Sequence, residues 1–143
     1  MPRSGRKNFF LKEASMKQQS ELTIVTKAKE LCSYIVTITQ KSPKQFRFTF
    51  VTRLQNLSLD AIEKIYFANE VLLEKGNARN AEKRLALQHS ALTLFKLIAY
   101  ISELAMKENC ILFKQYEQIA KLTTDCQRLT GAWINSDKKR LSS

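Results

Sequence analysis

The chain is poor in the residues that interrupt helices. Its 143 residues include only three glycines and two prolines. Because tight turns depend on these two residue types, their scarcity predicts few turns and favours long helices over many short strands. No run of 18 apolar residues occurs, so we expect no transmembrane helix. The apolar stretch Phe9–Leu11 is too short for the core of a signal peptide, and we therefore expect a cytoplasmic protein.

Residues suited to catalysis or metal binding are also scarce. The one histidine, His89, is interpreted as a structural or surface residue. The three cysteines are widely spaced and form no CxxC pair, which favours reduced, structural thiols over a zinc site: Cys32, Cys110 and Cys126. The glutamates lack the ExxH pairing of a di-iron bundle, and no glycine-rich phosphate loop is present. We expect no catalytic residue, no metal and no cofactor, and we predict that the protein is not an enzyme.

Positive charge is the most prominent feature of the composition. Lysine and arginine total 24 against 13 acidic residues, which gives a net charge of +11 and an isoelectric point near 9.8. This excess predicts a polyanionic partner, either a nucleic acid or an anionic membrane surface. The alternative is a basic protein whose charge serves only solubility. We predict a mobile basic arm over residues 1–19, one helical domain over 20–136 and a basic, frayed tail over 137–143.

Apolar periodicity predicts two helices in the first half of the chain. The first begins after Ser20, which is suited to capping, and ends before Pro43. Its apolar residues recur at helical spacing: Ile24, Ala28, Leu31, Ile35 and Ile38. The second is expected over Phe46–Glu74, with an uncertain start because residues 47–51 alternate like a strand. Its apolar stripe comprises Leu54, Leu57, Ala61, Ile65, Ala68 and Leu72.

Two further helices are predicted in the second half, over residues 79–108 and 113–135. The third has a main apolar face formed by Leu85, Leu92, Phe95, Ile98, Ile101, Leu104 and Ala105. A second apolar side suggests contact with another subunit: Leu87, Leu94, Leu97 and Tyr100. The fourth carries Ile119, Leu122, Cys126, Leu129 and Trp133, and Gly131 within it suggests a close packing contact. Short connections predict an up-down-up-down antiparallel four-helix bundle.

Basic residues gather around the first two connections, which lie at opposite ends of such a bundle. The candidate nucleic-acid-binding residues are Lys41, Lys44, Arg47, Arg53, Lys75, Arg79, Lys83 and Arg84. Arginine suits phosphate because its guanidinium group presents a bidentate fork. Phe46, Phe48 and Phe50 alternate with the first group. They either stack on bases or, as we favour from the sequence, serve as core or subunit contacts.

Several segments of the sequence, and the order in which they follow one another, resemble a known family. They are a connection containing Pro43, the Arg47-Phe48 step, the segment Arg53–Asn56, and a closing Gly131-x-Trp133-x-x-Ser136. Together they resemble the accessory variability determinant (Avd) proteins of diversity-generating retroelements, over residues 27–136. Ala132 stands where those proteins commonly have a second glycine. Related bundles encoded in 23S ribosomal RNA intervening sequences carry an Ile-Pro-Ala-Asn-Ile-Ala-Glu-Gly segment, of which this chain has only Asn69-Glu70.

The resemblance implies a specific assembly and function. Avd proteins are four-helix bundles that assemble into a pentameric, barrel-like ring. They bind the reverse transcriptase of the element and its template RNA, and they support mutagenic synthesis of complementary DNA without a catalytic centre. The resemblance thus leads us to expect a homopentamer with a reverse transcriptase and RNA as partners, whereas the residues alone predict a bundle, extra apolar faces and an anionic partner.

Overall fold

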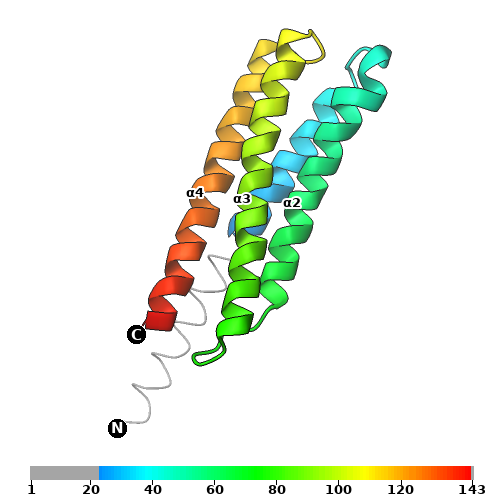
Figure 1. Ribbon diagram of the computed structural model, residues 1–143. Coiled ribbons are helices and arrows are strands. Elements are labelled where there is room, and N and C mark those ends of the chain that lie inside the picture. Colours follow the sequence, from blue (N-terminus) through cyan, green and yellow to red (C-terminus); the bar gives the residue numbers. More distant parts are fainter. Residues whose placement is uncertain (1–22, 143) are drawn as a thin grey trace.

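A computed structural model describes residues 23–142, and these residues form helices and no strand (Figure 1). The four helices are α1, whose described part covers residues 23–39, then α2 (Thr52–Glu70), α3 (Ala78–Lys107) and α4 (Phe113–Ser142). A 3₁₀ turn, η1 (Lys44–Phe46), and a π-helical segment, η2 (Arg47–Val51), lead into α2. The predicted all-α four-helix bundle is confirmed for the described residues. The predicted arm over 1–19 and the cap at Ser20 lie outside them.

The first two helices bury the apolar stripes predicted for them. All five predicted residues of α1 are buried, and so are five of the six predicted for α2. The exception is Leu72, which is 59% exposed because α2 ends at Glu70 and Val71 is extended. The predicted end of this helix at Glu74 is therefore wrong. The strand-like alternation of residues 47–51 is also misleading, since these residues are helical.

The inward stripe of α3 differs from the predicted one. Its buried residues step regularly by four and three positions: Arg84, Gln88, Ala91, Phe95, Ile98, Ser102 and Ala105. Leu85 and Leu92 are only half-buried, and Leu104 is exposed. Phe95, Ile98 and Ala105 are buried as predicted. The prediction was wrong for the other positions because it followed the largest apolar residues, while the helix uses polar ones at part of its core face. Among the described helices, α3 is the one long and apolar enough to cross a membrane by composition. In the structure α3 packs against both α2 and α4, and 28% of its apolar window is buried.

The fourth helix continues well beyond its predicted end at Asn135. It runs to Ser142, and Asp137 within the predicted frayed tail is buried. A buried ion pair to α3 holds this last part of the helix in place. Gly131 lies inside the helix and does not end it, as expected. However, a Cβ atom added there would meet nothing within 4 Å among the described residues, so the close packing contact predicted for Gly131 is not found within the chain.

Hydrogen bonds bring separate connections together at each end of the bundle. At one end, the Ser42 hydroxyl donates to the Cys110 carbonyl oxygen over 2.8 Å. This contact joins residues 40–53 to residues 108–113, and we call this region the η2 end. At the opposite end, α3 bonds both to Val71 and to α4. We call this region, residues 70–84 and 133–142, the Arg84 end (Figure 1).

Candidate nucleic-acid interface

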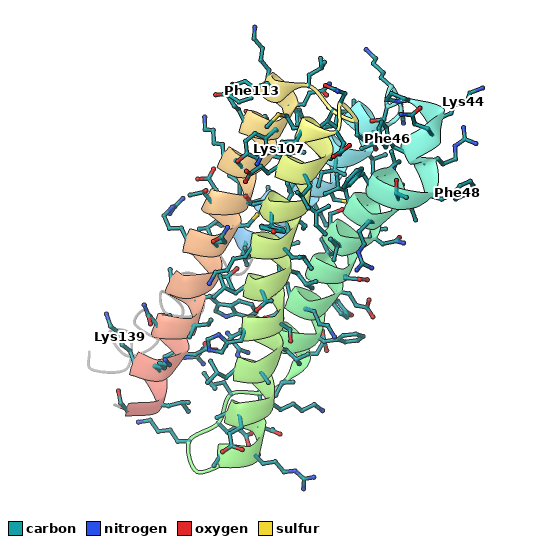
Figure 2. The ribbon with its side chains drawn as sticks, turned by 45° about the horizontal axis from the view of Figure 1, so that its top comes forward. Lys44, Phe46, Phe48, Lys107, Phe113 and Lys139 are labelled. Carbon is teal, nitrogen blue, oxygen red and sulfur yellow. The ribbon has the colours of Figure 1, made fainter. Side chains whose placement is uncertain are left out.

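Four predicted basic residues share the η2 end. All four are exposed, and among the described residues they make no ion pair: Lys41, Lys44, Arg47 and Arg53. No acidic residue occurs between positions 40 and 53. Figure 2 shows Lys44 and Lys107 at this end together with Phe46, Phe48 and Phe113, while Lys139 lies toward the other end. The local charge is therefore not neutralised along this segment, and it is available to an anionic partner.

The geometry of η2 separates the three phenylalanines. The Thr52 backbone N–H and its hydroxyl both donate to the Arg47 carbonyl oxygen, which closes the wide turn of a π-helix. Phe46 and Phe50 are half-buried against the core, with ring centroids 5.9 Å apart. Phe48 lies on the opposite side of the turn and is 87% exposed. Two of the three thus act as core contacts, as favoured from the sequence, and Phe48 does not.

Two pockets border η2. One, of about 400 Å³, is polar and includes Lys44, Arg47, Ser42, Thr52 and Gln55 in its lining. The other, of about 510 Å³, lies between the start of α2 and the end of α3. Its lining includes Phe48, Ile101 and Leu104 together with Arg53, Asn56 and Asp60. Positive charge and hydroxyl groups are therefore found in one pocket, and apolar surface with a few polar groups in the other.

At the Arg84 end, the predicted basic residues have different environments. Lys75, Arg79 and Lys83 are exposed, but Arg84 has only 2% of its surface exposed. Its Nε and Nη2 atoms donate to the two carboxylate oxygens of Asp137 over 2.7 and 3.1 Å. The prediction that Arg84 binds nucleic acid is therefore wrong, since a buried, bidentate carboxylate contact replaces the phosphate contact expected for it.

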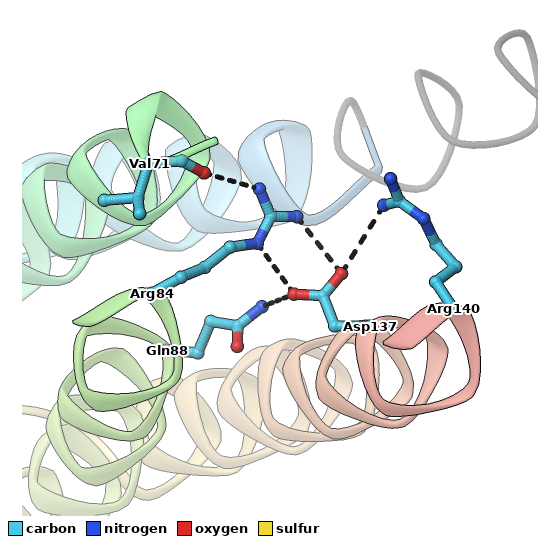
Figure 3. A network of polar contacts seen from close by, with 5 residues as sticks. All are labelled: Val71, Arg84, Gln88, Asp137 and Arg140. Carbon is cyan, nitrogen blue, oxygen red and sulfur yellow. Dashed lines mark hydrogen bonds and ion pairs between the residues drawn. The ribbon is translucent and has the colours of Figure 1, made fainter. Parts of the chain in front are cut away.

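Three more groups complete this buried network (Figure 3). Arg84 Nη1 donates to the Val71 carbonyl oxygen over 3.1 Å, and Gln88 Nε2 donates to Asp137 over 2.8 Å. Arg140 lies 3.7 Å from the same carboxylate. One carboxylate of α4 thereby fixes the start of α3 and, through Arg84, the end of α2. Buried charges of this kind are tolerated because they are paired and hydrogen-bonded.

Trp133 packs within its own chain beside this network. It is 3% exposed, and the guanidinium group of Arg84 lies 5.2 Å from the centroid of its ring, within the range of a cation–π contact. Its indole N–H is buried and makes no hydrogen bond with the described residues. Trp133 is thus a core packing residue, as its place on the predicted apolar stripe of the fourth helix indicated.

The second apolar side predicted for α3 is only partly covered. Leu87, Leu94 and Leu97 are half-buried against the core, and Tyr100 is 64% exposed. Exposed large apolar residues are also found on α2, at Leu59, Tyr66 and Phe67. The outward surfaces of α2 and α3 therefore carry several exposed or half-buried large apolar side chains.

Two of the three cysteine thiols are buried. Burial raises the pKa of the Cys126 thiol to about 12 and also raises the pKa of Cys110, so both thiols are protonated at neutral pH. Cys32 is half-buried and His89 is exposed. Within residues 23–142, no group of three or more His, Cys, Asp or Glu residues is placed to hold a metal ion.

Sequence reasoning missed Asp137 and Gln88, which complete the buried network. A signal for both was present, because each continues the three- and four-residue stepping of its helix. Asp137 follows Trp133 by four positions, and Gln88 lies between Arg84 and Ala91 on the α3 stripe. Both are polar, and a search for apolar residues passes over them. Asn56 and Asp60 in the larger pocket give no comparable signal, since both are ordinary exposed helix residues.

Comparison of the chain with protein-family models, with curated proteins and with solved structures finds no match.

Proposed function

We propose that this protein is a non-catalytic accessory protein of a diversity-generating retroelement, which binds the reverse transcriptase and the template RNA and supports mutagenic synthesis of complementary DNA. The observation that carries the proposal is the exposed, unneutralised cationic segment at the η2 end. The resemblance to Avd proteins names the partner, and the segment supplies charge for the RNA backbone. DNA is a second candidate ligand, since phosphate contacts alone do not distinguish the two.

The proposal includes an assembly. We infer an up-down-up-down antiparallel bundle that forms a homopentamer in the cytoplasm. Three contacts support the topology: Ser42 to Cys110 at one end, and Val71 and Asp137 to Arg84 at the other. The exposed apolar residues of α2 and α3 support self-association. A pentamer would carry five times the net charge of +11, and a bound polyanion would offset that charge.

Purification of the tagged chain from its native host tests the function. Mass spectrometry would identify bound proteins, and sequencing would identify bound RNA. We expect a reverse transcriptase and one enriched RNA. A mixed RNA population without a polymerase would contradict the retroelement role.

A second function is supported by the distribution of charge. Basic residues lie at both ends of the bundle, with Lys75, Arg79 and Lys83 exposed at the Arg84 end. This arrangement fits a basic homo-oligomer that binds nucleic acids or other anions in general, as an rRNA intervening-sequence-type protein. Such a protein would bind RNAs of different sequence with equal affinity, and added salt would lower its affinity for each of them to the same extent. Competition between the element's RNA and an unrelated RNA of equal length separates the two functions.

A further inference from the structure

The π-helical segment η2 holds an aromatic side chain away from the bundle. Phe48 is 87% exposed, although it lies two residues from Phe46 and Phe50, which pack against the core. Contact between these two neighbours and the hydrogen bonds of Thr52 to Arg47 fix the turn. The position of Phe48 is therefore set by the helix rather than by a loop. π-Helical turns occur frequently at functional sites.

Different chemistry lies on the two sides of this aromatic residue. Lys44 and Arg47 line the polar pocket of about 400 Å³, with hydroxyl groups of Ser42 and Thr52 nearby. Phe48 itself lines the pocket of about 510 Å³, whose size lies within the range typical of small-molecule sites. A ligand that spans η2 would thus meet two cations and hydroxyl groups on one side, and an aromatic ring, apolar walls and the charged side chains of Arg53 and Asp60 on the other.

We propose that the η2 end binds a segment of single-stranded RNA, with a phosphate held by Lys44 and Arg47 and a neighbouring base stacked on Phe48 in the larger pocket. An alternation of charged groups and an aromatic ring matches the alternation of phosphates and bases along a single strand. A duplex does not fit this arrangement, because its bases are already stacked and paired. The proposal rests on the proposed RNA-binding function and names the form of RNA and the site that receives it.

The polar groups of the larger pocket do not single out one base. Arg53 and Asn56 can donate hydrogen bonds, and Asn56 and Asp60 can accept them. Every base, uracil with its N3–H included, offers a donor and an acceptor, so the pocket receives a base through stacking on Phe48.

Binding of a labelled single-stranded oligonucleotide of about ten nucleotides tests the site by fluorescence anisotropy, since such lengths suit one binding module. We expect Phe48→Leu, which removes the ring but keeps the apolar volume, to weaken binding by about 5- to 150-fold without changing its salt dependence. Arg47→Ala should lower the slope of log affinity against log salt by about 0.7, the value for one phosphate contact to a single strand. Phe48→Trp should retain binding, because it keeps an aromatic ring for stacking.

Matched controls separate the outcomes. Tyr66→Leu changes a different exposed aromatic residue, in α2, and is the control for Phe48→Leu. Lys121→Ala removes an exposed cation of α4 and is the control for Arg47→Ala. Neither control should alter single-strand binding. The site is refuted if Phe48→Leu leaves single-strand binding unchanged, or if it weakens duplex binding as much as single-strand binding. It is also refuted if light scattering shows that Phe48→Leu dissociates an oligomer. In each of these cases the RNA-binding function stands. If the unmodified protein binds no RNA, both proposals fail.

Discussion

The two ends of the bundle carry basic residues in similar number but use them differently. At the η2 end, Lys41, Lys44, Arg47 and Arg53 are all exposed. At the Arg84 end, one arginine of a similar group is drawn into the core by Asp137, which lies 53 positions away in the sequence. The difference shows that the role of a basic residue depends on which carboxylate the fold brings to it. At the Arg84 end, a buried ion pair therefore holds two helices together. At the η2 end, all four basic side chains face solvent.

The largest effect on stability is expected when the carboxylate that pairs with Arg84 is removed. We expect Asp137→Ala to lower the free energy of unfolding by about 3–5 kcal/mol, because it leaves the Arg84 guanidinium buried without a counter-charge. Chemical denaturation measures the loss. The same experiment on Asp125→Ala gives the control. Asp125 is more exposed and its cationic partners Lys27 and Arg128 lie 3.9 and 3.8 Å away, so only about 0–1 kcal/mol is expected.

The double variant Arg84→Met, Asp137→Leu adds a further check. It replaces both charges with apolar groups of similar size, so it should regain most of the stability lost in Asp137→Ala. If Asp137→Ala is as stable as the unmodified protein, the buried pair does not hold the Arg84 end.

A smaller effect is expected where the two connections meet at the η2 end. Ser42→Ala removes the hydrogen bond to the Cys110 carbonyl oxygen and should lower the free energy of unfolding by about 1 kcal/mol. Thr37→Ala is the matched control, since its exposed hydroxyl bonds only to Ser33 in its own helix and its loss should change stability by less than about 0.5 kcal/mol. Equal effects of the two changes would mean that the Ser42 contact does not join the connections.

The smallest effect is expected at Gly131, near the Arg84 end. Gly131→Ala should raise the free energy of unfolding by about 0.5–1 kcal/mol, because the added methyl group meets open space and alanine favours the helix. Gly76→Ala should have the opposite sign, since Gly76 has a φ of +84°. Thermal unfolding and light scattering test both. Destabilisation or dissociation by Gly131→Ala would instead indicate that a second subunit packs against this position.

The sequence predicts the helices well because their spacing depends on local physics. The stripes of α1 and α2 follow apolar periodicity, and the connection at Pro43 follows from backbone geometry. The end of α4 was mispredicted because Asp137 continues the stepping of the helix as a polar residue, and its burial depends on a long-range ion pair with Arg84. Arg84 was assigned to the surface for the same reason. Asp137 as its partner could be recognised only once the fold had placed α3 beside α4.

The candidate site was predictable in part. The charge of residues 41–53 and the aromatic alternation within them are visible in the sequence. Which phenylalanine faces solvent depends on the π-helical turn, whereas the sequence left the start of this helix uncertain because residues 47–51 alternate like a strand. Asn56 and Asp60 join the site through pocket geometry between α2 and α3, which no spacing rule describes.

The environment of Trp133 makes it an intrinsic fluorescence probe of the fold. It is the single tryptophan of the chain, it is nearly enclosed, and a guanidinium group lies over its ring. Its emission therefore reports on the integrity of the Arg84 end, whereas circular dichroism reports on all helices together. Where the two signals change at the same denaturant concentration, the bundle unfolds as one unit. Where the emission changes first, the Arg84 end opens before the rest.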